Sequence, residues 1–445
     1  MKNILVLGAG LSTISLINYL LKHAESEDWF IDLGDMDKGL AKKKINGNTR
    51  AKAHQFDICN LADHIDLLKN ADLVISMLPA RFHPLVADAC LEHNKTMVTA
   101  SYVSEEIKKL DAQLKEKNLL FFNELGVDPG IDHMSAMKII DEIKEKGGKL
   151  ISFKSRTGGL VAPEYDNNPW NYKFTWNPRN VVLAGQGTSM FIRNNRYKYI
   201  PYHKLFSRLE HTNVQDVGEF EVYPNRDSLI YRQTYDLANL PTMVRGTMRR
   251  PGFCEAWDVF VQLGMTDDNV IIEDSENMTY LQFVNTYLWY DPNTPVIDKL
   301  ADYIGIEKDG KIMNKIKWLG IFDDEKIGLS NATPAMILQK KLEEKLSLDP
   351  DDKDMIVMEH VLEWVLDGKT FETSSSLVVK GINQEETAMA ITVGTPLAIA
   401  TKLVLNGTIK RTGVQIPVKP DMYLPILEEL ETMGIKFIEE TKELS

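Results

Sequence analysis

The first 123 residues alternate short apolar runs with amphipathic stretches. Residues 3–7 are almost wholly apolar, as in a buried parallel strand, and residues 12–22 carry apolar side chains at helical spacing. The same pattern predicts strands at 29–33, 72–76, 96–99 and 119–122, and helices at 84–93 and 104–116. Strands and helices that alternate at this pitch predict an α/β fold with a doubly wound, Rossmann-type parallel sheet.

The pattern changes after residue 124. A helix is predicted at 131–146 and a strand at 149–155, followed by aromatic-rich, strand-like segments to about residue 252. Residues 253–348 are mostly helical in pattern, and an acidic stretch at 349–354 marks a boundary. A hairpin over 356–379 turns at Asp367 and Gly368, and a helix of small residues over 387–405 ends at Asn406 and Gly407.

Length and charge narrow the class of protein. A chain of 445 residues predicts two or three domains, and 44% hydrophobic with 26% charged residues is the composition of a soluble globular protein. The net charge of -13 disfavours nucleic acid and anionic membranes as partners, because both need a basic surface. It leaves room for an anionic small substrate in a locally basic pocket.

The cysteines and the N-terminal residues indicate in which cellular compartment the protein is located. Cys59, Cys90 and Cys254 have no metal-like spacing, so we expect buried thiols in a reducing compartment and no metal site. The apolar run at the N-terminus ends at Gly8 and is too short for a signal peptide, and no uninterrupted apolar stretch approaches the 18 residues of a membrane-spanning helix. We therefore expect a cytoplasmic protein with no membrane partner.

A glycine-rich turn follows the first predicted strand and opens the first predicted helix. Gly8 permits a tight turn, and Gly10 lets the backbone approach a pyrophosphate at the helix N-terminus, where Leu11 and Ser12 follow. Thr13 stands where the full pattern has a third small residue. The strand-turn-helix context favours a dinucleotide site over a turn without a ligand.

Acidic residues at the ends of the next strands are candidate nucleotide contacts. Asp35 follows the second strand at the spacing of a carboxylate that binds the adenosine ribose. Asp37 could bind the ribose as well, but for Asp37 we favour the alternative, a solvated loop residue. Asp57 ends the third strand, near the expected adenine, unless it is a turn residue. We also expect cofactor contacts at these loop positions: Ile58, Leu78 and Pro79.

Two further segments carry candidate substrate residues. Asp128 and Pro129 suit a helix N-cap and first position, but a carboxylate there can also accept a hydrogen bond from a substrate amine. For His133, within the helix, we favour a structural role.

The arginines are candidates for binding carboxylates of the substrate, because the guanidinium matches a carboxylate. We favour this role for Arg226 and Arg249 and leave it open for Arg245. We expect Arg250 to pair with surface carboxylates instead.

These pieces together resemble saccharopine dehydrogenase of the L-glutamate-forming type, also called saccharopine reductase. The resemblance spans the whole chain in order, and it is carried by LVLGAG (5–10), FHP (82–84), TASY (99–102), NELGVDPGIDH (123–133), GGLVAPE (158–164), NPWNYKFTW (168–176), YPNRDS (223–228), RGTMR (245–249) and AIATKLVLNGTI (398–409).

The resemblance implies domains and site residues. A Rossmann domain would comprise 1–123, completed by 386–445; a mixed α/β substrate domain would comprise 124–252 and 349–385, with a helical insertion at 253–348. The implied substrate contacts are Ser101, Tyr102, Asp128, Arg226, Thr247, Met248 and Arg249. Tyr102 and Asp128 are the catalytic candidates, for orienting the amine and the attacking water. A homodimer is expected from the frequency of this state among enzymes of this size.

Three departures from the family pattern qualify the resemblance. Thr157 replaces a cysteine before GGL, so that cysteine is not required here. Ala80 and Arg81 replace the usual Tyr-Thr before FHP. Asp35 falls where NADP-using members carry an arginine, which predicts a strong preference for NAD over NADP because a carboxylate repels the 2′-phosphate.

The implied activity is the NAD-dependent oxidative cleavage of saccharopine to L-glutamate and 2-aminoadipate 6-semialdehyde, or the reverse, in lysine metabolism. One alternative is a reductive-amination enzyme like carboxynorspermidine dehydrogenase, whose substrate has a single carboxylate and is therefore disfavoured by several pocket arginines. Another is a non-catalytic nucleotide-binding sensor, which would need only the glycine turn and not the arginine cluster.

Overall fold

The computed structural model describes residues 1–184 and 186–444. The chain divides into two compact units, each with its own core. The first contains Met1–Leu150, Trp364–Lys369 and Leu377–Glu440, and the second contains Ile151–Glu363, Thr370–Ser376 and Thr441–Ser445. Each unit is described by itself below.

The first unit is built on a parallel sheet. Within the described residues its strand order is β15-β6-β5-β4-β1-β2-β3, and every neighbouring pair is parallel, so the predicted doubly wound sheet is confirmed. The strands are β1 (Lys2–Leu7), β2 (Trp29–Asp35), β3 (Ala51–Gln55), β4 (Leu73–Ser76), β5 (Thr96–Val98), β6 (Leu120–Phe122) and β15 (Gly413–Gln415). The order reverses between β1 and β4, which is where such sheets bind ligands.

The first unit also contains helices. They are η1 (Leu11–Thr13), α1 (Ile14–His23), α2 (Lys38–Ile45), η2 (Ile58–His64), α3 (Ile65–Asn70), η3 (Ala80–Phe82), α4 (His83–Glu92), α5 (Glu105–Lys108), α6 (Asp111–Glu116), α7 (Ile131–Glu145), α15 (Ala388–Leu405) and α16 (Pro420–Thr432). The single helix predicted at 104–116 is in fact two, α5 and α6. The apolar side chains of β1 are buried, among them Leu5 and Leu7, which join one hydrophobic cluster with Val74 of β4.

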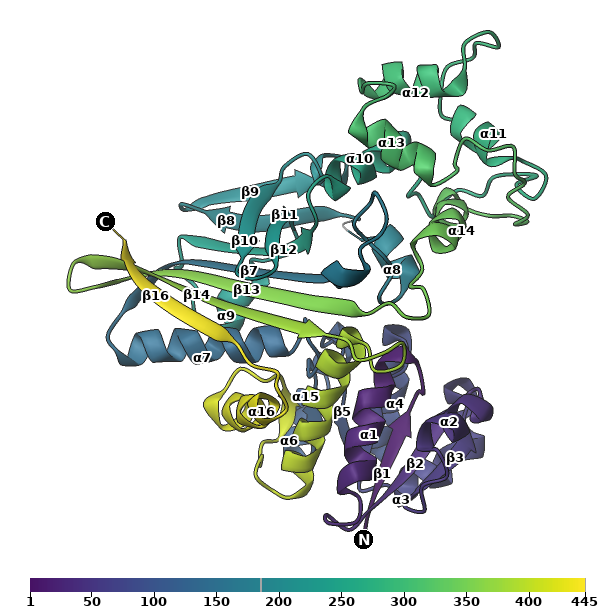
Figure 1. Ribbon diagram of the computed structural model, residues 1–445. Helices are drawn as coiled ribbons and strands as arrows, with labels where there is room; N and C mark the ends of the chain where they lie inside the picture. Colours follow the sequence, from purple (N-terminus) through teal and green to yellow (C-terminus); the bar gives the residue numbers. More distant parts are fainter. Residues whose placement is uncertain (185, 445) are drawn as a thin grey trace. The chain divides into compact units, whose positions relative to one another are not determined.

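Helix α15 packs lengthwise against α1 (Figure 1). A Cβ on Gly394 would lie 2.7 Å from the backbone nitrogen of Leu16, so only glycine permits this close approach. By length and composition alone α15 could cross a membrane, with 18 residues and a mean hydropathy of 1.7, which corrects the expectation that no such stretch exists. Yet 67% of it is buried inside the protein, as in the core helix of a folded domain.

The second unit is built on a mixed sheet. Within the described residues the main path is β10-β11-β12-β7-β13-β14-β16, with β8 paired to β12 and to β9. The strands are β7 (Lys149–Val161), β8 (Thr188–Arg193), β9 (Arg196–Pro201), β10 (Glu210–Val214), β11 (Gly218–Pro224), β12 (Thr242–Arg249), β13 (Asp354–Leu366), β14 (Lys369–Lys380) and β16 (Ile438–Leu444). β12 is parallel to β7 and antiparallel to β11.

Short helices and a helical segment complete the second unit. The short ones are η4 (Pro163–Tyr165), α8 (Pro178–Val182), η5 (Tyr202–Lys204) and α9 (Ile230–Thr234). The segment between β12 and β13 contains α10 (Phe253–Leu263), α11 (Tyr280–Asn285), α12 (Val296–Ile304), α13 (Lys311–Trp318) and α14 (Pro334–Leu346), which gather in one part of the unit (Figure 1). Trp170 stacks on Phe260 of α10 with ring centroids 5.7 Å apart and so anchors α10 to the rest of the unit.

The cysteine expectation holds for two of the three residues. Cys90 and Cys254 are buried, whereas Cys59 is exposed in the first turn of η2. None of the three forms a disulfide among the described residues.

Candidate active site

The glycine turn has the geometry that a dinucleotide phosphate requires. Gly8 has φ of +101°, and a Cβ there would lie 2.8 Å from the carbonyl oxygen of Met77, so no other residue fits. A Cβ on Gly10 would meet nothing within 4 Å, which means that there is open space beside the turn. No side chain caps the first N–H groups of η1, and Leu11 is exposed. These uncapped N–H groups and the open space at Gly10 suit an anionic phosphate.

Lys44 supports this turn from α2, and the sequence analysis missed it. Its Nζ donates to Thr13 Oγ1 over 2.9 Å and also to the carbonyl oxygen of Gly10. Burial lowers the pKa of Lys44 to about 8, with the negative charges of Glu385 and Asp35 opposing that shift. Lys44 therefore places a titratable positive charge beside the phosphate turn; a cluster of lysines in α2 was the only sequence signal.

The acidic residues predicted to bind the nucleotide are engaged with their own backbone. Asp35 accepts from the N–H of Ala9 over 2.7 Å on one carboxylate oxygen and from the N–H of Asp37 over 2.8 Å on the other. Asp37 caps α2 by accepting from Gly39 and Leu40. Asp35 therefore ties the glycine turn to the end of β2.

Asp57 and the remaining predicted cofactor residues lie in the loops of the first unit. Asp57 caps η2, accepting from the Cys59 N–H over 2.9 Å, so a turn role accounts for it. Ile58 is buried at the start of η2. Leu78 and Pro79 lie beyond the carboxyl end of β4, separated from it by one residue, and Pro79 is exposed.

A chain of hydrogen bonds joins the carboxyl ends of β4 and β5. His83, the first residue of α4, contacts Ser76 Oγ through Nδ1 over 2.8 Å and Ser101 Oγ through Nε2 over 2.7 Å. Thr99 Oγ1 donates to the carbonyl oxygen of Ser76 over 2.7 Å. Ser101, a predicted substrate contact, is thus fixed by a buried histidine that the sequence analysis quoted only as part of a motif.

Tyr102 and Asp128, the two catalytic candidates, contact each other. The Tyr102 hydroxyl donates to Asp128 Oδ1 over 3.2 Å, and Tyr102 is 41% exposed. The capping role expected of Asp128 is wrong: α7 begins at Ile131 after Gly130, whose φ of +146° turns the chain between Asp128 and the helix. The Gly130 N–H instead donates to Asp132 Oδ1 over 2.6 Å. The Asp128 carboxylate is therefore not needed to start the helix.

A buried pair fixes the loop that carries Asp128. His133 Nε2 lies 2.7 Å from Glu124 Oε2, and the other oxygen of Glu124 accepts from the Val103 N–H over 3.1 Å. His133 is fully buried. This pair joins the segment after β5 to the segment after β6, which fits the structural role favoured for His133.

In the second unit, the predicted substrate residues of β12 point to both faces of the sheet. Thr247 lies opposite Thr157 of β7 and Tyr223 of β11, so three hydroxyl side chains form a row on one face. Arg249 follows on the same face. Met248 points to the other face, where it packs against Gly158, so only its backbone is available on the Arg249 face.

Arg249 is enclosed, and no carboxylate among the described residues pairs with it. It is 4% exposed, and its guanidinium carbon lies 5.2 Å from the ring centroid of Tyr172 and 5.4 Å from that of Phe253. Its Nη1 donates to the Met248 carbonyl oxygen over 2.9 Å, while Nε has no partner in the described part of the chain. Glu221, its neighbour across the strands, instead accepts from the N–H groups at the start of α10.

Tyr172 is the second residue of this cluster, and the sequence analysis gave it no role. Its ring is fully buried and its hydroxyl has no hydrogen-bond partner among the described residues. Burial raises the pKa of Tyr172 to about 12, and the nearby charge of Arg249 opposes that rise. Two unused donors, the Tyr172 hydroxyl and Arg249 Nε, therefore lie in one buried cluster; the quoted segment NPWNYKFTW was the available signal.

The other arginines of the predicted cluster differ in their surroundings. Arg226 is exposed in a left-handed turn with φ of +43°, and no described residue forms an ion pair with it. Arg245 is buried with its guanidinium 4.0 Å from the ring centroid of Tyr231. Arg250 donates to the Val217 carbonyl oxygen over 2.9 Å and lies over Phe220, not on the surface carboxylate expected.

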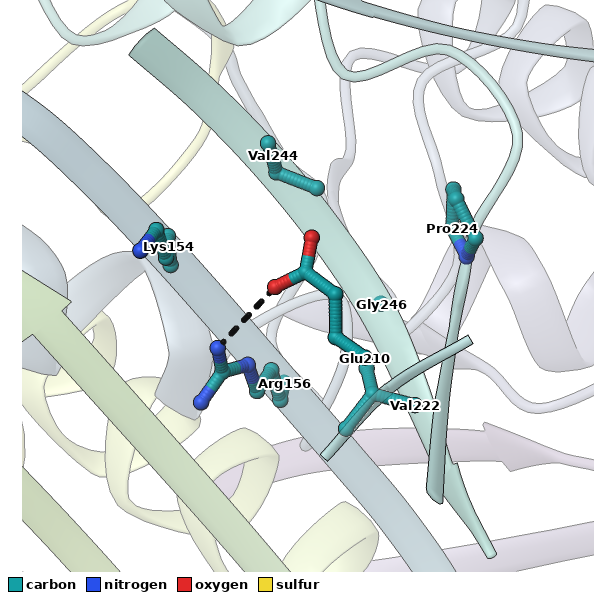
Figure 2. A pocket seen from close by; sticks show the side chains of 7 residues that line it. All are labelled: Lys154, Arg156, Glu210, Val222, Pro224, Val244 and Gly246. Atoms are coloured by element: carbon teal, nitrogen blue, oxygen red, sulfur yellow. Dashed lines mark hydrogen bonds and ion pairs between the residues drawn. The ribbon is translucent and has the colours of Figure 1, made fainter. Parts of the chain in front are cut away.

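A shallow pocket on the second unit's sheet is a different site (Figure 2). Val244 and Gly246 of β12 line it, so strand alternation places it on the opposite face from Thr247 and Arg249. Its Arg156 is already paired, with Glu359 over 2.6 Å and with Glu210 over 3.3 Å. These glutamates compensate the charge, so this arginine is not available to bind a substrate carboxylate.

The fold and the turn define a Rossmann-type dinucleotide-binding domain joined to a second, mixed α/β unit. Residues 4–121 match the family described as "Saccharopine dehydrogenase NADP binding domain", and residues 126–435 match "Saccharopine dehydrogenase C-terminal domain". The chain belongs to the saccharopine dehydrogenase family, oxidoreductases of lysine metabolism that act on saccharopine.

Full-length relatives agree with this assignment. The chain is 33% identical to saccharopine dehydrogenase [NADP(+), L-glutamate-forming] of Saccharomyces cerevisiae, over 99% of both chains. It is 33% identical to the mitochondrial alpha-aminoadipic semialdehyde synthase of Mus musculus, covering 98% of this chain and 47% of that protein. The structure of the S. cerevisiae apo saccharopine dehydrogenase (L-Glu forming) matches with a TM-score of 0.89 at 32% identity, over 99% of this chain and 100% of that chain.

The expected preference for NAD over NADP is contradicted. The family that matches residues 4–121 is described as NADP binding, and the S. cerevisiae and Schizosaccharomyces pombe relatives are named for NADP(+). The structure supplies a physical reason for the error. Both carboxylate oxygens of Asp35 accept hydrogen bonds from backbone N–H groups, which disperse the negative charge. Asp35 therefore repels the 2′-phosphate of NADP less than a free carboxylate would, and the prediction from residue type and spacing assumed a free carboxylate.

We expect the affinity for a dinucleotide to depend on the charge of Lys44. The ammonium is charged below its pKa of about 8, so its attraction for phosphate is present at pH 7 and is lost as the pH rises above 8. Fluorescence titration with NADPH should show roughly tenfold weaker binding at high pH, the scale of one charge-assisted hydrogen bond. Lys44→Arg should remove this loss, because arginine stays charged.

The exposed Lys42, which is not among the charges that shift the pKa of Lys44, provides the control. Lys42→Met should keep the wild-type pH profile. A profile that is flat in the wild type, or identical in wild type and Lys44→Arg, would mean that Lys44 does not act on the nucleotide.

Proposed function

We propose that the protein catalyses the NADP+-dependent oxidative cleavage of saccharopine to L-glutamate and 2-aminoadipate 6-semialdehyde, or the reverse condensation. The observation that carries this proposal is Arg249, a buried guanidinium without an acidic partner among the described residues. The similarity to L-glutamate-forming relatives over 99% of the chain supports the reaction, and their names support the coenzyme.

Saccharopine carries three carboxylates, and among the residues described neither Arg226 nor Arg249, the two arginines favoured for substrate carboxylates, has an acidic partner. We assign one carboxylate to Arg249 with the Tyr172 hydroxyl, since both have an unused donor in a buried site where a charged hydrogen bond is strong. We assign another to Arg226, whose exposed guanidinium stands in a left-handed turn. Thr247 lies on the same sheet face as Arg249 and is a further donor.

We assign the secondary amine to the pair Tyr102 and Asp128. The Asp128 carboxylate accepts from the Tyr102 hydroxyl, and an ionised carboxylate is an acceptor that suits an amine N–H. Tyr102 is 41% exposed, which leaves its hydroxyl accessible to a water molecule. In this arrangement Asp128 orients the nitrogen and Tyr102 orients the attacking water.

The proposed reaction needs no nucleophile from the protein, but it does need the substrate and a water molecule to be positioned. The bound coenzyme supplies a hydride acceptor for the lysine-derived carbon beside the amine. The resulting carbon–nitrogen double bond adds water, and the carbinolamine collapses with cleavage of the carbon–nitrogen bond, which releases the amine of glutamate and the aldehyde. One proton is released overall. The chain's part is to hold the carboxylates, orient the nitrogen and admit one water.

A direct assay tests the proposal. The purified protein, saccharopine and NADP+ should produce NADPH together with equimolar L-glutamate. No turnover of saccharopine with either coenzyme would contradict the activity, and formation of lysine in place of glutamate would contradict the direction of cleavage. Turnover of carboxynorspermidine but not saccharopine would favour the reductive-amination alternative. Nucleotide binding without turnover of either would favour a sensor. The cytoplasmic location and the homodimer stay predictions.

Asp128→Asn should lower kcat/KM for saccharopine at least tenfold, because the neutral amide weakens binding of the amine by about 1.5–3 kcal/mol. The free energy of unfolding should hardly change, since Asp128 does not cap α7. Urea unfolding and steady-state kinetics measure the two effects.

The neighbouring Asp132 provides the opposite control. Asp132→Ala leaves the Gly130 N–H without its partner, so it should lower stability while activity per folded molecule is kept. If Asp128→Asn instead lost stability and kept its activity, the assignment of the amine would fail.

Tyr172→Phe should raise the KM for saccharopine roughly fivefold to tenfold, as expected for a lost hydrogen bond to a charged group. Its stability should stay the same or rise, because the removed hydroxyl is buried without a partner among the described residues. Tyr280 of α11 is also buried, and its hydroxyl has no partner within the part of the chain that the structure describes, which makes Tyr280→Phe the matched control. Equal KM values for the two variants would show that the Tyr172 hydroxyl does not contact substrate.

A further inference from the structure

His83 connects two serines at the ligand-binding edge of the first unit's sheet. It is 2% exposed and starts α4, while Ser76 ends β4 and Ser101 follows β5. The contacts of 2.8 Å to Ser76 Oγ and 2.7 Å to Ser101 Oγ use both ring nitrogens. The imidazole is therefore fixed at both ends, although no role in the proposed reaction has been assigned to it.

The imidazole is neutral. Burial lowers the pKa of His83 to about 4, and its place at the N-terminus of α4 also disfavours a positive charge. A neutral ring has one N–H donor and one acceptor nitrogen. The two contacts must therefore run in one direction, from Ser76 through His83 to Ser101 or the reverse.

The available hydrogen-bond partners of Ser76 determine the direction of this chain of hydrogen bonds. Ser76 Oγ is buried, and within the described residues the only acceptor it contacts is His83 Nδ1. A buried hydroxyl without an acceptor is costly, so Ser76 donates to Nδ1. The proton then lies on Nε2, which donates to Ser101 Oγ. With its oxygen occupied by this donor, the Ser101 hydroxyl keeps its own proton for another acceptor.

Ser101 is held at its backbone as well. Its N–H donates to Thr99 Oγ1 over 3.3 Å, and its carbonyl oxygen accepts from the Glu124 N–H over 3.1 Å. Thr99 in turn donates to the Ser76 carbonyl oxygen. The backbone of Ser101 is thus held by Thr99, which follows β5, and by Glu124, which follows β6. The orientation of the Ser101 hydroxyl is not set by these backbone contacts, and His83 is the residue that can set it.

We propose that His83 is a positioning residue that holds the Ser101 hydroxyl as a hydrogen-bond donor toward a carboxylate of the substrate. This inference rests on the proposed function, and it takes Ser101 as the saccharopine contact that the resemblance to the family implies. His83 itself does not touch the substrate and transfers no proton, because the chain ends at the buried Ser76.

Two amide substitutions separate positioning from packing. In His83→Gln the side-chain amide reaches the Nε2 position and can donate to Ser101, whereas in His83→Asn it reaches only the Nδ1 position and contacts Ser76 alone. We expect His83→Asn to lower kcat/KM for saccharopine tenfold or more and His83→Gln to lower it less than threefold. Both should bind NADPH like the wild type. His93→Gln, at the other end of α4, is the control and should match the wild type.

A double variant tests the coupling to Ser101. His83→Asn should cause no further loss in a Ser101→Ala background, because the hydroxyl that it positions is already gone. Equal losses in His83→Asn and His83→Gln, or additive losses with Ser101→Ala, would overturn the proposal and leave a packing role. Absence of saccharopine turnover in the wild type would instead overturn the proposed function.

A stability measurement tests the buried neutral ring independently of turnover. Between pH 6.5 and pH 4 an unfolded histidine takes up a proton while folded His83 does not, so the wild type loses stability as the pH falls through this range. His83→Gln lacks this contribution and should lose less stability over the same range. Equal pH dependence in the two proteins would show that His83 is charged or exposed, and would overturn the proposed direction of the hydrogen bonds.

Discussion

The second unit encloses the positive charge of Arg249 without a carboxylate among the described residues to neutralise it, and the proposed chemistry depends on that constraint. Removing an ion from water costs several kcal/mol even after relaxation, whereas contacts with aromatic rings return only about 0.5–2 kcal/mol. Glu221, which lies opposite Arg249 on β11, instead accepts from N–H groups at the start of α10. In the proposed reaction a carboxylate of the substrate is the partner of this charge.

The contrast with Arg156 shows that burial of an arginine alone does not define a site. Arg156 is also buried in the same sheet, but Glu359 neutralises it together with Glu210, and Figure 2 shows the contact with Glu210. The sheet thus has one face where charge is balanced internally and another where donors are left unused. In the first unit, the hydrogen-bond chain from Ser76 through His83 has matched donors and acceptors until it reaches Ser101. Both units leave polar groups available where substrate contacts were predicted.

Much of the fold could be predicted from the sequence, because the period of apolar residues is a local property. The run at 3–7 and the turn from Gly8 to Gly10 indicated β1, the start of the first helix and a Rossmann-type sheet without any tertiary information. The site was harder to predict. The partners of Asp35 are backbone N–H groups from two segments of the chain, and the arrangement of those segments is not visible in a residue pattern. The same reason hid Lys44, whose contact with Thr13 joins two helices.

The most direct measurement is thermal unfolding of the wild type and Arg249→Met, each with and without saccharopine. If Arg249 is an uncompensated charge kept for an anion, methionine should leave the unliganded protein at least as stable while abolishing the rise in Tm that saccharopine causes in the wild type. NADPH should stabilise both proteins equally. A variant that is less stable without ligand, yet is still stabilised by saccharopine as the wild type is, would contradict the account.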